Sequence, residues 1–186
     1  MAGDRVFDLI ERLGALLRSE LRRLGAPHGL EPVLLQALAY LARANRYSDT
    51  PIAVAEFLGL TKGNVSQRLI ALEKAGMLLR RPDRHDARVV HLAPTAKAQA
   101  LLAALSPPPA WRAAMAASGE DTAGLEAGLT GLLSALQRAN GRRTFGQCRG
   151  CRFLQRDGDT FTCGLTRDPL EPGDTLLLCR EHEAAA

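Results

Sequence analysis

Long hydrophobic runs are missing from this chain of 186 residues. No apolar stretch approaches the roughly 18 residues that a helix needs to cross a bilayer. Charged residues between Asp4 and Arg12 interrupt the N-terminal segment, which therefore has no apolar core of signal-peptide type. We expect no membrane partner and no export, and hence a cytoplasmic protein.

Catalytic patterns are missing as well. The sequence shows no Ser/His/Asp arrangement, no glycine-rich phosphate loop and no paired carboxylates on a helix face. We therefore expect no enzymatic activity. Cysteine is absent before Cys148, and in the cytoplasm the four cysteines that follow should be reduced or metal-bound rather than paired in structural disulfides.

The chain has enough apolar residues, 46%, to bury a proper core, and its formal net charge is +4. A positive excess of this size suits a polyanionic partner without identifying one. Its distribution is more informative, because Arg80, Arg81, Arg84 and Arg88 lie within one short segment. That segment and its neighbours carry the main functional signal.

Residues 61–74 have the pattern of a short helix with two different faces. Val65, Leu69 and Leu72 recur at helical spacing and form one narrow apolar stripe, and Thr61 is a good N-cap. The exposed face carries side chains of the types that hydrogen-bond base edges and phosphates: Lys62, Asn64, Ser66, Gln67 and Arg68. We interpret this helix as one that enters DNA.

A second helix is predicted just upstream, over 50–58, with Pro51 in its first turn and Gly59-Leu60 as the tight turn between the helices. Such helix pairs also occur in proteins that never contact nucleic acid. The continuation favours DNA binding, since two β-prone runs, 77–81 and 88–92, flank a charged loop and predict a hairpin wing.

Residues 31–105 resemble the winged helix-turn-helix of the MarR family of bacterial transcription regulators. The family's wing motif Asp-x-Arg-Asp-x-Arg aligns with 83–88, with His85 where an arginine is usual, and Leu-Glu-Lys-Ala-Gly-Met-Leu at 72–78 also fits. The resemblance implies that Arg84 and Arg88 reach a minor groove. His85 would bring less charge there than an arginine. The candidate DNA-binding residues are Thr61, Lys62, Asn64, Ser66, Gln67, Arg68, Arg84, His85 and Arg88.

Further helices are predicted over 6–24, 32–44, 95–105, 110–117 and 122–140. The fold class is therefore mostly α with a small β-hairpin wing (α+β), and 1–140 form one domain. By the resemblance, the first and last helices interlock two subunits, which implies a homodimer that addresses two half-sites of double-stranded DNA. Alternatively, the apolar stripe of 6–24 packs in the core of its own chain. The prolines at 107–109 depart from the long unbroken helix that is usual in the family.

Residues 141–186 form a separate module that contains every cysteine. Cys148 and Cys151 make a C-x2-C pair, Cys163 and Cys179 follow, and His182 stands at C-x2-H spacing from Cys179. We predict a metal site held by the four cysteines, with His182 as a reserve ligand. A reduced-cysteine core or a dithiol redox switch is the alternative. We also expect the helix-turn-helix core to draw nothing from this tail.

Zinc is the metal that the C-x2-C and C-x2-H spacings favour, and an iron–sulfur cluster is the alternative, because four cysteines suffice for one. The predicted function is a sequence-specific transcription regulator, specifically a repressor, whose C-terminal module responds to metal or redox state or braces the dimer. A small-molecule effector is possible. The alternatives are a zinc-stapled interaction adaptor and a metal-dependent redox protein that does not bind DNA; an adaptor would not need the basic wing.

Overall fold

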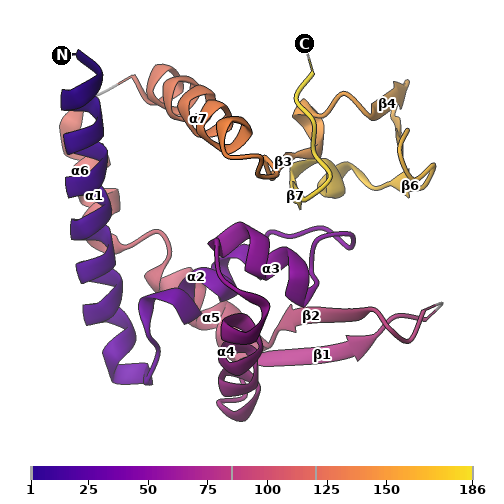
Figure 1. Ribbon diagram of the computed structural model, residues 1–186, viewed down its shortest axis with the longest axis horizontal. Coiled ribbons are helices and arrows are strands. Elements are labelled where there is room, and N and C mark those ends of the chain that lie inside the picture. Colours follow the sequence, from indigo (N-terminus) through magenta and orange to yellow (C-terminus); the bar gives the residue numbers. More distant parts are fainter. Residues whose placement is uncertain (1, 85, 120, 186) are drawn as a thin grey trace.

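The computed structural model describes residues 2–84, 86–119 and 121–185. Its first part is helical: α1 (Ala2–Gly25), the 3-10 turn η1 (Ala26–His28), α2 (Pro32–Leu41), α3 (Pro51–Leu58) and α4 (Lys62–Lys74). A hairpin of β1 (Leu78–Pro82) and β2 (Val90–Pro94) follows, and then α5 (Ala96–Leu105), α6 (Pro109–Ser118) and α7 (Thr122–Ala139). The predicted fold class is confirmed (Figure 1).

The local signals in the sequence work as predicted. Thr50, Thr61 and Thr95 each accept a hydrogen bond from the backbone N–H three residues on, at the start of α3, α4 and α5. Gly59 ends α3 in the left-handed region, at φ 65°, which only glycine adopts without strain. Strands β1 and β2 pair antiparallel, with Arg80 opposite Leu92.

The core lies between α2, α3, α4, α5 and the base of the wing. Its fully buried side chains include Leu38, Tyr40, Val54, Val65, Leu69, Leu72 and Leu92. The apolar stripe of α4 therefore faces inward, as its spacing predicted, and this leaves the polar face of the helix outside. Among the described residues, no helix combines the length and the apolar character needed to cross a membrane.

The C-terminal module consists of short strands and turns that the sequence analysis did not predict. They are β3 (Gly146–Gln147), η2 (Cys148–Gly150), β4 (Leu154–Asp157), β5 (Thr160–Cys163), β6 (Pro169–Leu170), η3 (Pro172–Leu176) and β7 (Leu178–Cys179). Strands β4, β5 and β6 form one small sheet, and β3 pairs with β7. The module lies over α3 and the wing (Figure 1).

The expectation that the helix-turn-helix core draws nothing from the tail is wrong. Phe145 is buried in that core, with its ring centroid 5.9 Å from that of Tyr40 and 5.3 Å from that of Phe57, both edge-on. Tyr40 and Phe57 stack on each other at 4.3 Å. The helix predicted over 32–44 ends at Leu41, and Ala44 forms a β-bridge with Leu178 of the tail. The tail thus supplies part of the core against which α2 and α3 pack.

Candidate nucleic-acid interface and cysteine-lined cavity

Helix α4 presents a polar surface of fixed start and orientation. Its N-cap, Thr61, accepts a hydrogen bond at Oγ1 from the N–H of Asn64, over 3.4 Å. The polar side chains Lys62, Asn64, Ser66 and Gln67 are all exposed. Because the opposite stripe is buried in the core, these groups are held on a rigid element and can contact a flat or grooved partner without rearrangement of the backbone.

Arg68 differs from the other candidates on α4. Its side chain is half-buried, and one guanidinium NH group donates to the backbone oxygen of Asn64 over 3.2 Å. Its Nε is buried and has no hydrogen-bond partner within the described residues. The arginine therefore lies along its own helix, and contact with a phosphate requires its guanidinium to turn outward.

The wing tip carries exposed cations on a loop that its own aspartates shape. Arg84 is exposed, and the Arg88 side chain is 90% exposed while it forms two hydrogen bonds of 2.9 Å to the carboxylate of Asp86. These bonds, with Arg88 as the main cause, lower the pKa of Asp86. The side chain of Asp83 accepts the N–H of Asp86 over 2.9 Å. His85, the remaining wing candidate, lies outside the described residues.

His91, which the sequence analysis missed, fastens the wing to the loop before α3. Its Nδ1 is 2.6 Å from Oδ1 of Asp49, and its Nε2 is 3.0 Å from Oδ2 of Asp83. The hydrogen bond to Asp49, followed by that to Asp83, raises the pKa of His91. Burial raises the pKa of Asp49, although its bond to His91 acts in the opposite sense. An imidazole between two carboxylates is favoured in its charged form.

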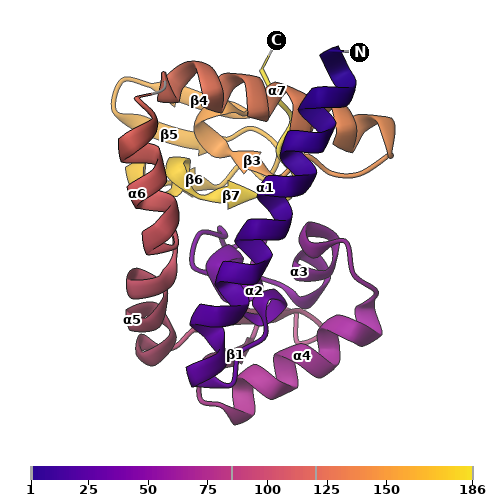
Figure 2. The ribbon, with the colours of Figure 1, turned by 90° about the vertical axis from the view of Figure 1, so that its left-hand side faces the viewer.

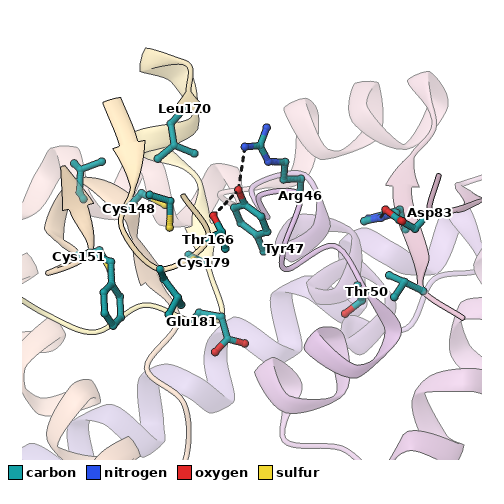
Figure 3. A pocket seen from close by; sticks show the side chains of 16 residues that line it. Arg46, Tyr47, Thr50, Asp83, Cys148, Cys151, Thr166, Leu170, Cys179 and Glu181 are labelled. Carbon is teal, nitrogen blue, oxygen red and sulfur yellow. Dashed lines mark hydrogen bonds and ion pairs between the residues drawn. The ribbon is translucent and has the colours of Figure 1, made fainter. Parts of the chain in front are cut away.

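All four cysteines line one cavity of about 360 Å³ between the C-terminal module and the winged helix (Figure 3). The module contributes Cys148, Cys151, Cys163 and Cys179 to its wall, together with Phe153, Leu154, Leu165 and Leu170. The wing and the loop before α3 contribute Asp83, Val89, His91, Arg46, Tyr47 and Thr50. The structure therefore brings the four predicted ligands to one place, and that place adjoins the wing.

Two of the thiols, those of Cys148 and Cys179, change each other's pKa. Cys148 and Cys179 are each 8% exposed, and Asn45 donates from Nδ2 to the sulfur of Cys148 over 3.7 Å. A hydrogen bond from Cys148 lowers the pKa of Cys179 to about 6, and the same bond raises the pKa of Cys148. The two thiols therefore titrate as a coupled pair in which one proton is lost more readily than the other.

The reserve ligand is not brought to the cavity wall. The ring of His182 lies against Gly146, so closely that a Cβ there would stand 2.4 Å from it, and its Nδ1 is 3.3 Å from Oγ1 of Thr144. Burial lowers the pKa of His182. Within the part of the chain that the structure describes, no three His, Cys, Asp or Glu side chains are arranged to hold a single metal ion.

Polar contacts attach the module to the winged helix on the cavity side. Tyr47 donates to Oδ2 of Asp168 over 2.5 Å, and Arg46 donates to the backbone oxygen of Pro169 over 2.9 Å. The backbone N–H of Arg180 donates to Oγ of Ser48 over 2.8 Å. No pattern in the sequence indicates these pairs, because their members stand more than a hundred positions apart.

Helices α1 and α7 leave apolar side chains uncovered. On α1 these are Val6, Phe7, Leu9, Ile10, Leu13 and Leu16, which are 40–64% exposed. On α7 they are Leu125, Leu129, Leu132, Leu133 and Leu136, which are 41–60% exposed, and no residue of α7 is buried. Figure 2 shows α1 running diagonally past α2 toward α7. Exposed apolar surface of this extent and regularity marks an interaction face.

Residues 28–89, which contain α2, α3, α4 and β1, match the model of the MarR family. Three solved structures are similar in fold. MepR of S. aureus in its DNA-binding conformation has a TM-score of 0.62 at 21% identity, over 71% of this chain and 98% of that chain. CouR from Rhodococcus jostii RHA1, bound to p-coumaroyl-CoA, has a TM-score of 0.60 at 18% identity, over 73% and 94%. The regulator BldR from Sulfolobus solfataricus has 0.57 at 22% identity, over 73% and 99%.

These matches cover each relative almost completely, whereas more than a quarter of this chain lies outside each of them. No protein of curated function matches the chain in sequence. At such identities the likeness establishes the fold, and the chemistry of the site must be argued from the residues of this chain.

Proposed function

From the MarR-type winged-helix fold we propose that this protein is a sequence-specific, DNA-binding transcription regulator, a homodimeric repressor, and not an enzyme. One observation carries the proposal. The polar face of α4 is exposed on the side opposite its buried apolar stripe, and a wing with exposed arginines projects beside it. A recognition helix with an adjacent basic wing is the arrangement that reads a major groove and steadies the register through backbone and minor-groove contacts.

The proposed contacts divide into two kinds. Asn64, Ser66 and Gln67 have groups that hydrogen-bond base edges, so they supply sequence preference. Lys62, Arg84 and Arg88 supply phosphate or minor-groove contacts, which add affinity for any sequence. The ion pair between Arg88 and Asp86 must open or turn for Arg88 to bind DNA. Because the Arg88 side chain is 90% exposed, that change costs little free energy.

The dimer is proposed from the uncovered faces of α1 and α7. Their apolar residues follow one stripe on each helix, and nothing in the described part of the chain covers them. Two copies that bury these stripes against each other would place two recognition helices on successive half-sites. MepR, a fold relative, was solved in a DNA-binding conformation, which agrees with this use of the fold.

An effector pocket is the third element of the proposal. A mainly apolar cavity of about 290 Å³ lies between α1, α2 and α5, with Trp111 of α6 in its wall. CouR, another fold relative, was solved with p-coumaroyl-CoA bound. We assign this cavity to a small apolar or aromatic ligand, because its walls offer few polar groups.

Selection of bound sequences from a random double-stranded DNA library tests the proposal. We expect enrichment of a site with two similar half-sites about one helical turn apart, as two symmetric recognition helices require. Failure to enrich any sequence, with a folded wild-type dimer, would favour the adaptor or redox alternative.

A further inference from the structure

We propose that the cysteine-lined cavity holds an iron–sulfur cluster, ligated by Cys148, Cys151, Cys163 and Cys179, and that occupation of the cavity is transmitted to the wing. The regulatory half of this inference rests on the proposed function, whereas the cluster itself does not. It is argued from the size of the cavity, the placement of the thiols and the residues of its two walls.

The placement of the thiols favours a cluster over a single zinc ion. Zinc draws its ligands to one point, with each sulfur about 2.3 Å from the metal. Within the described residues no three ligand side chains are arranged in this way, although all four cysteines face one space. A space of about 360 Å³ far exceeds the roughly 10–15 Å³ that one water molecule needs. A cluster of several irons spreads four thiolates around such a volume.

The four thiols come from separate short elements, so they can reach a shared cluster from different sides. Cys148 begins η2 and Cys151 directly follows it, Cys163 ends β5, and Cys179 ends β7. Strand β3, just before Cys148, pairs with β7, where Gly146 stands opposite Cys179, so ligands from opposite ends of the module are brought together. The cluster would thus tie the whole module, which has only a small apolar core, into one unit.

The cavity wall suits a cluster. Phe153, Leu154, Leu165 and Leu170 provide apolar cover that limits access of water. The amide of Asn45 already donates to the sulfur of Cys148, and hydrogen bonds to ligand sulfur are one means by which proteins set the potential of a cluster. Charged side chains of both signs line the rest of the cavity wall: Arg46, Asp83 and Glu181.

The second wall of the cavity belongs to the DNA-binding apparatus. Asp83, Val89 and His91 are wing residues, and Figure 3 shows Asp83 on the far side of Tyr47 from Cys148 and Cys151. His91 joins Asp83 to Asp49 at this wall. Because Asp83 also shapes the wing tip through Asp86, an occupant that supports this wall fixes the position of the wing arginines.

The cluster is tested on full-length protein purified without oxygen and, where needed, reconstituted with ferrous and ferric iron and sulfide. We expect more than one iron per chain, an equal amount of acid-labile sulfide and visible absorbance. Cys163→Ser and Cys151→Ser, at half-buried positions, should lose the absorbance while circular dichroism shows the helices retained. His182→Ala should keep it, since His182 lies away from the cavity wall. One zinc per chain without iron would overturn the cluster, as would a metal-free protein with a Cys148–Cys179 disulfide.

Transmission to the wing is tested by fluorescence anisotropy on a selected DNA site, with and without the cluster. We expect DNA affinity to differ roughly 5- to 150-fold between the two forms, the usual size of an allosteric coupling. In His91→Gln the cluster should remain and this difference should shrink. Equal affinity of both wild-type forms would overturn the transmission alone. A loaded cluster in a protein that binds no DNA would instead overturn the proposed function and leave the cluster standing.

Discussion

Arg180, in the C-terminal module, forms two hydrogen bonds to the carboxylate of Glu56 on α3, from Nε over 2.5 Å and from a terminal nitrogen over 2.8 Å. The Arg180 side chain is only 19% exposed. The hydrogen bonding with Arg180 is the main cause that lowers the pKa of Glu56. Helix α3, which packs against α4, is therefore fastened to the module that carries the cysteines, and the two parts should unfold together.

Loss of this ion pair should destabilise the protein measurably. Arg180→Ala leaves the partly buried Glu56 with a weaker partner in Arg143, at 3.7 Å, and we expect a loss of about 1–3 kcal/mol in the free energy of unfolding. Chemical denaturation measures it. Arg152→Ala removes a more exposed pair, with Glu183, and is the matched control, with a cost of at most about 1 kcal/mol. Equal costs for the two variants would mean that the contact between module and helix is not stabilising.

Phe145 should contribute more than the ion pair, because it lies in the aromatic cluster with Tyr40 and Phe57. Phe145→Ala should cost about 3–5 kcal/mol, the usual range for loss of a buried phenylalanine. Thermal unfolding followed by circular dichroism should show the loss in the helical signal, although residue 145 lies outside every helix. An unchanged melting temperature would show that the winged helix folds without the tail.

Stability should depend on pH through His91. Its folded pKa is raised above the ordinary value of 6.5, so its contribution is complete below about 6.5 and is lost as the pH rises through the raised pKa. The difference in unfolding free energy between wild type and His91→Gln should therefore be largest at acid pH. It should decrease as the pH rises above about 6.5, through the raised pKa of His91. A difference that grows with pH would show that His91 is held neutral.

The apolar stripes of α1 and α7 should hold two subunits together. Leu13→Asp or Leu129→Asp should give monomer or unfolded protein in sedimentation, because each places an unpaired charge in the proposed interface at a cost of several kcal/mol. Arg12→Asp changes the charge on the same helix outside the stripe and should leave the dimer intact. A wild-type monomer at micromolar concentration would contradict the dimer.

Local signals predicted the winged helix well. The helix starts at Thr50, Thr61 and Thr95 are fixed by a side chain and a backbone N–H three residues away, so a single sequence contains both partners. The stripe of Val65, Leu69 and Leu72 likewise depends only on helical spacing. Features of this kind need no knowledge of what lies across the core.

Features that depend on distant pairs could not be predicted. His91 and Asp49 stand 42 positions apart, and Arg180 and Glu56 stand 124 apart. The cysteine spacing predicted one shared site, and Cys148, Cys151, Cys163 and Cys179 do line one cavity, but the spacing gave no sign that the wing forms the other wall of that cavity. The ligand role of the cysteines stays a prediction, and His182 is not among the residues that line their cavity.

The central claim, that α4 reads DNA while the wing adds affinity for any sequence, is tested most directly by titrating wild type, Gln67→Ala and Arg88→Ala against a selected and a scrambled site over a range of salt. Arg88→Ala should weaken binding to both sites and reduce the salt slope by about one, whereas Gln67→Ala should cost about 1–3 kcal/mol on the selected site alone. Wild-type affinity of both variants for both sites would contradict the account.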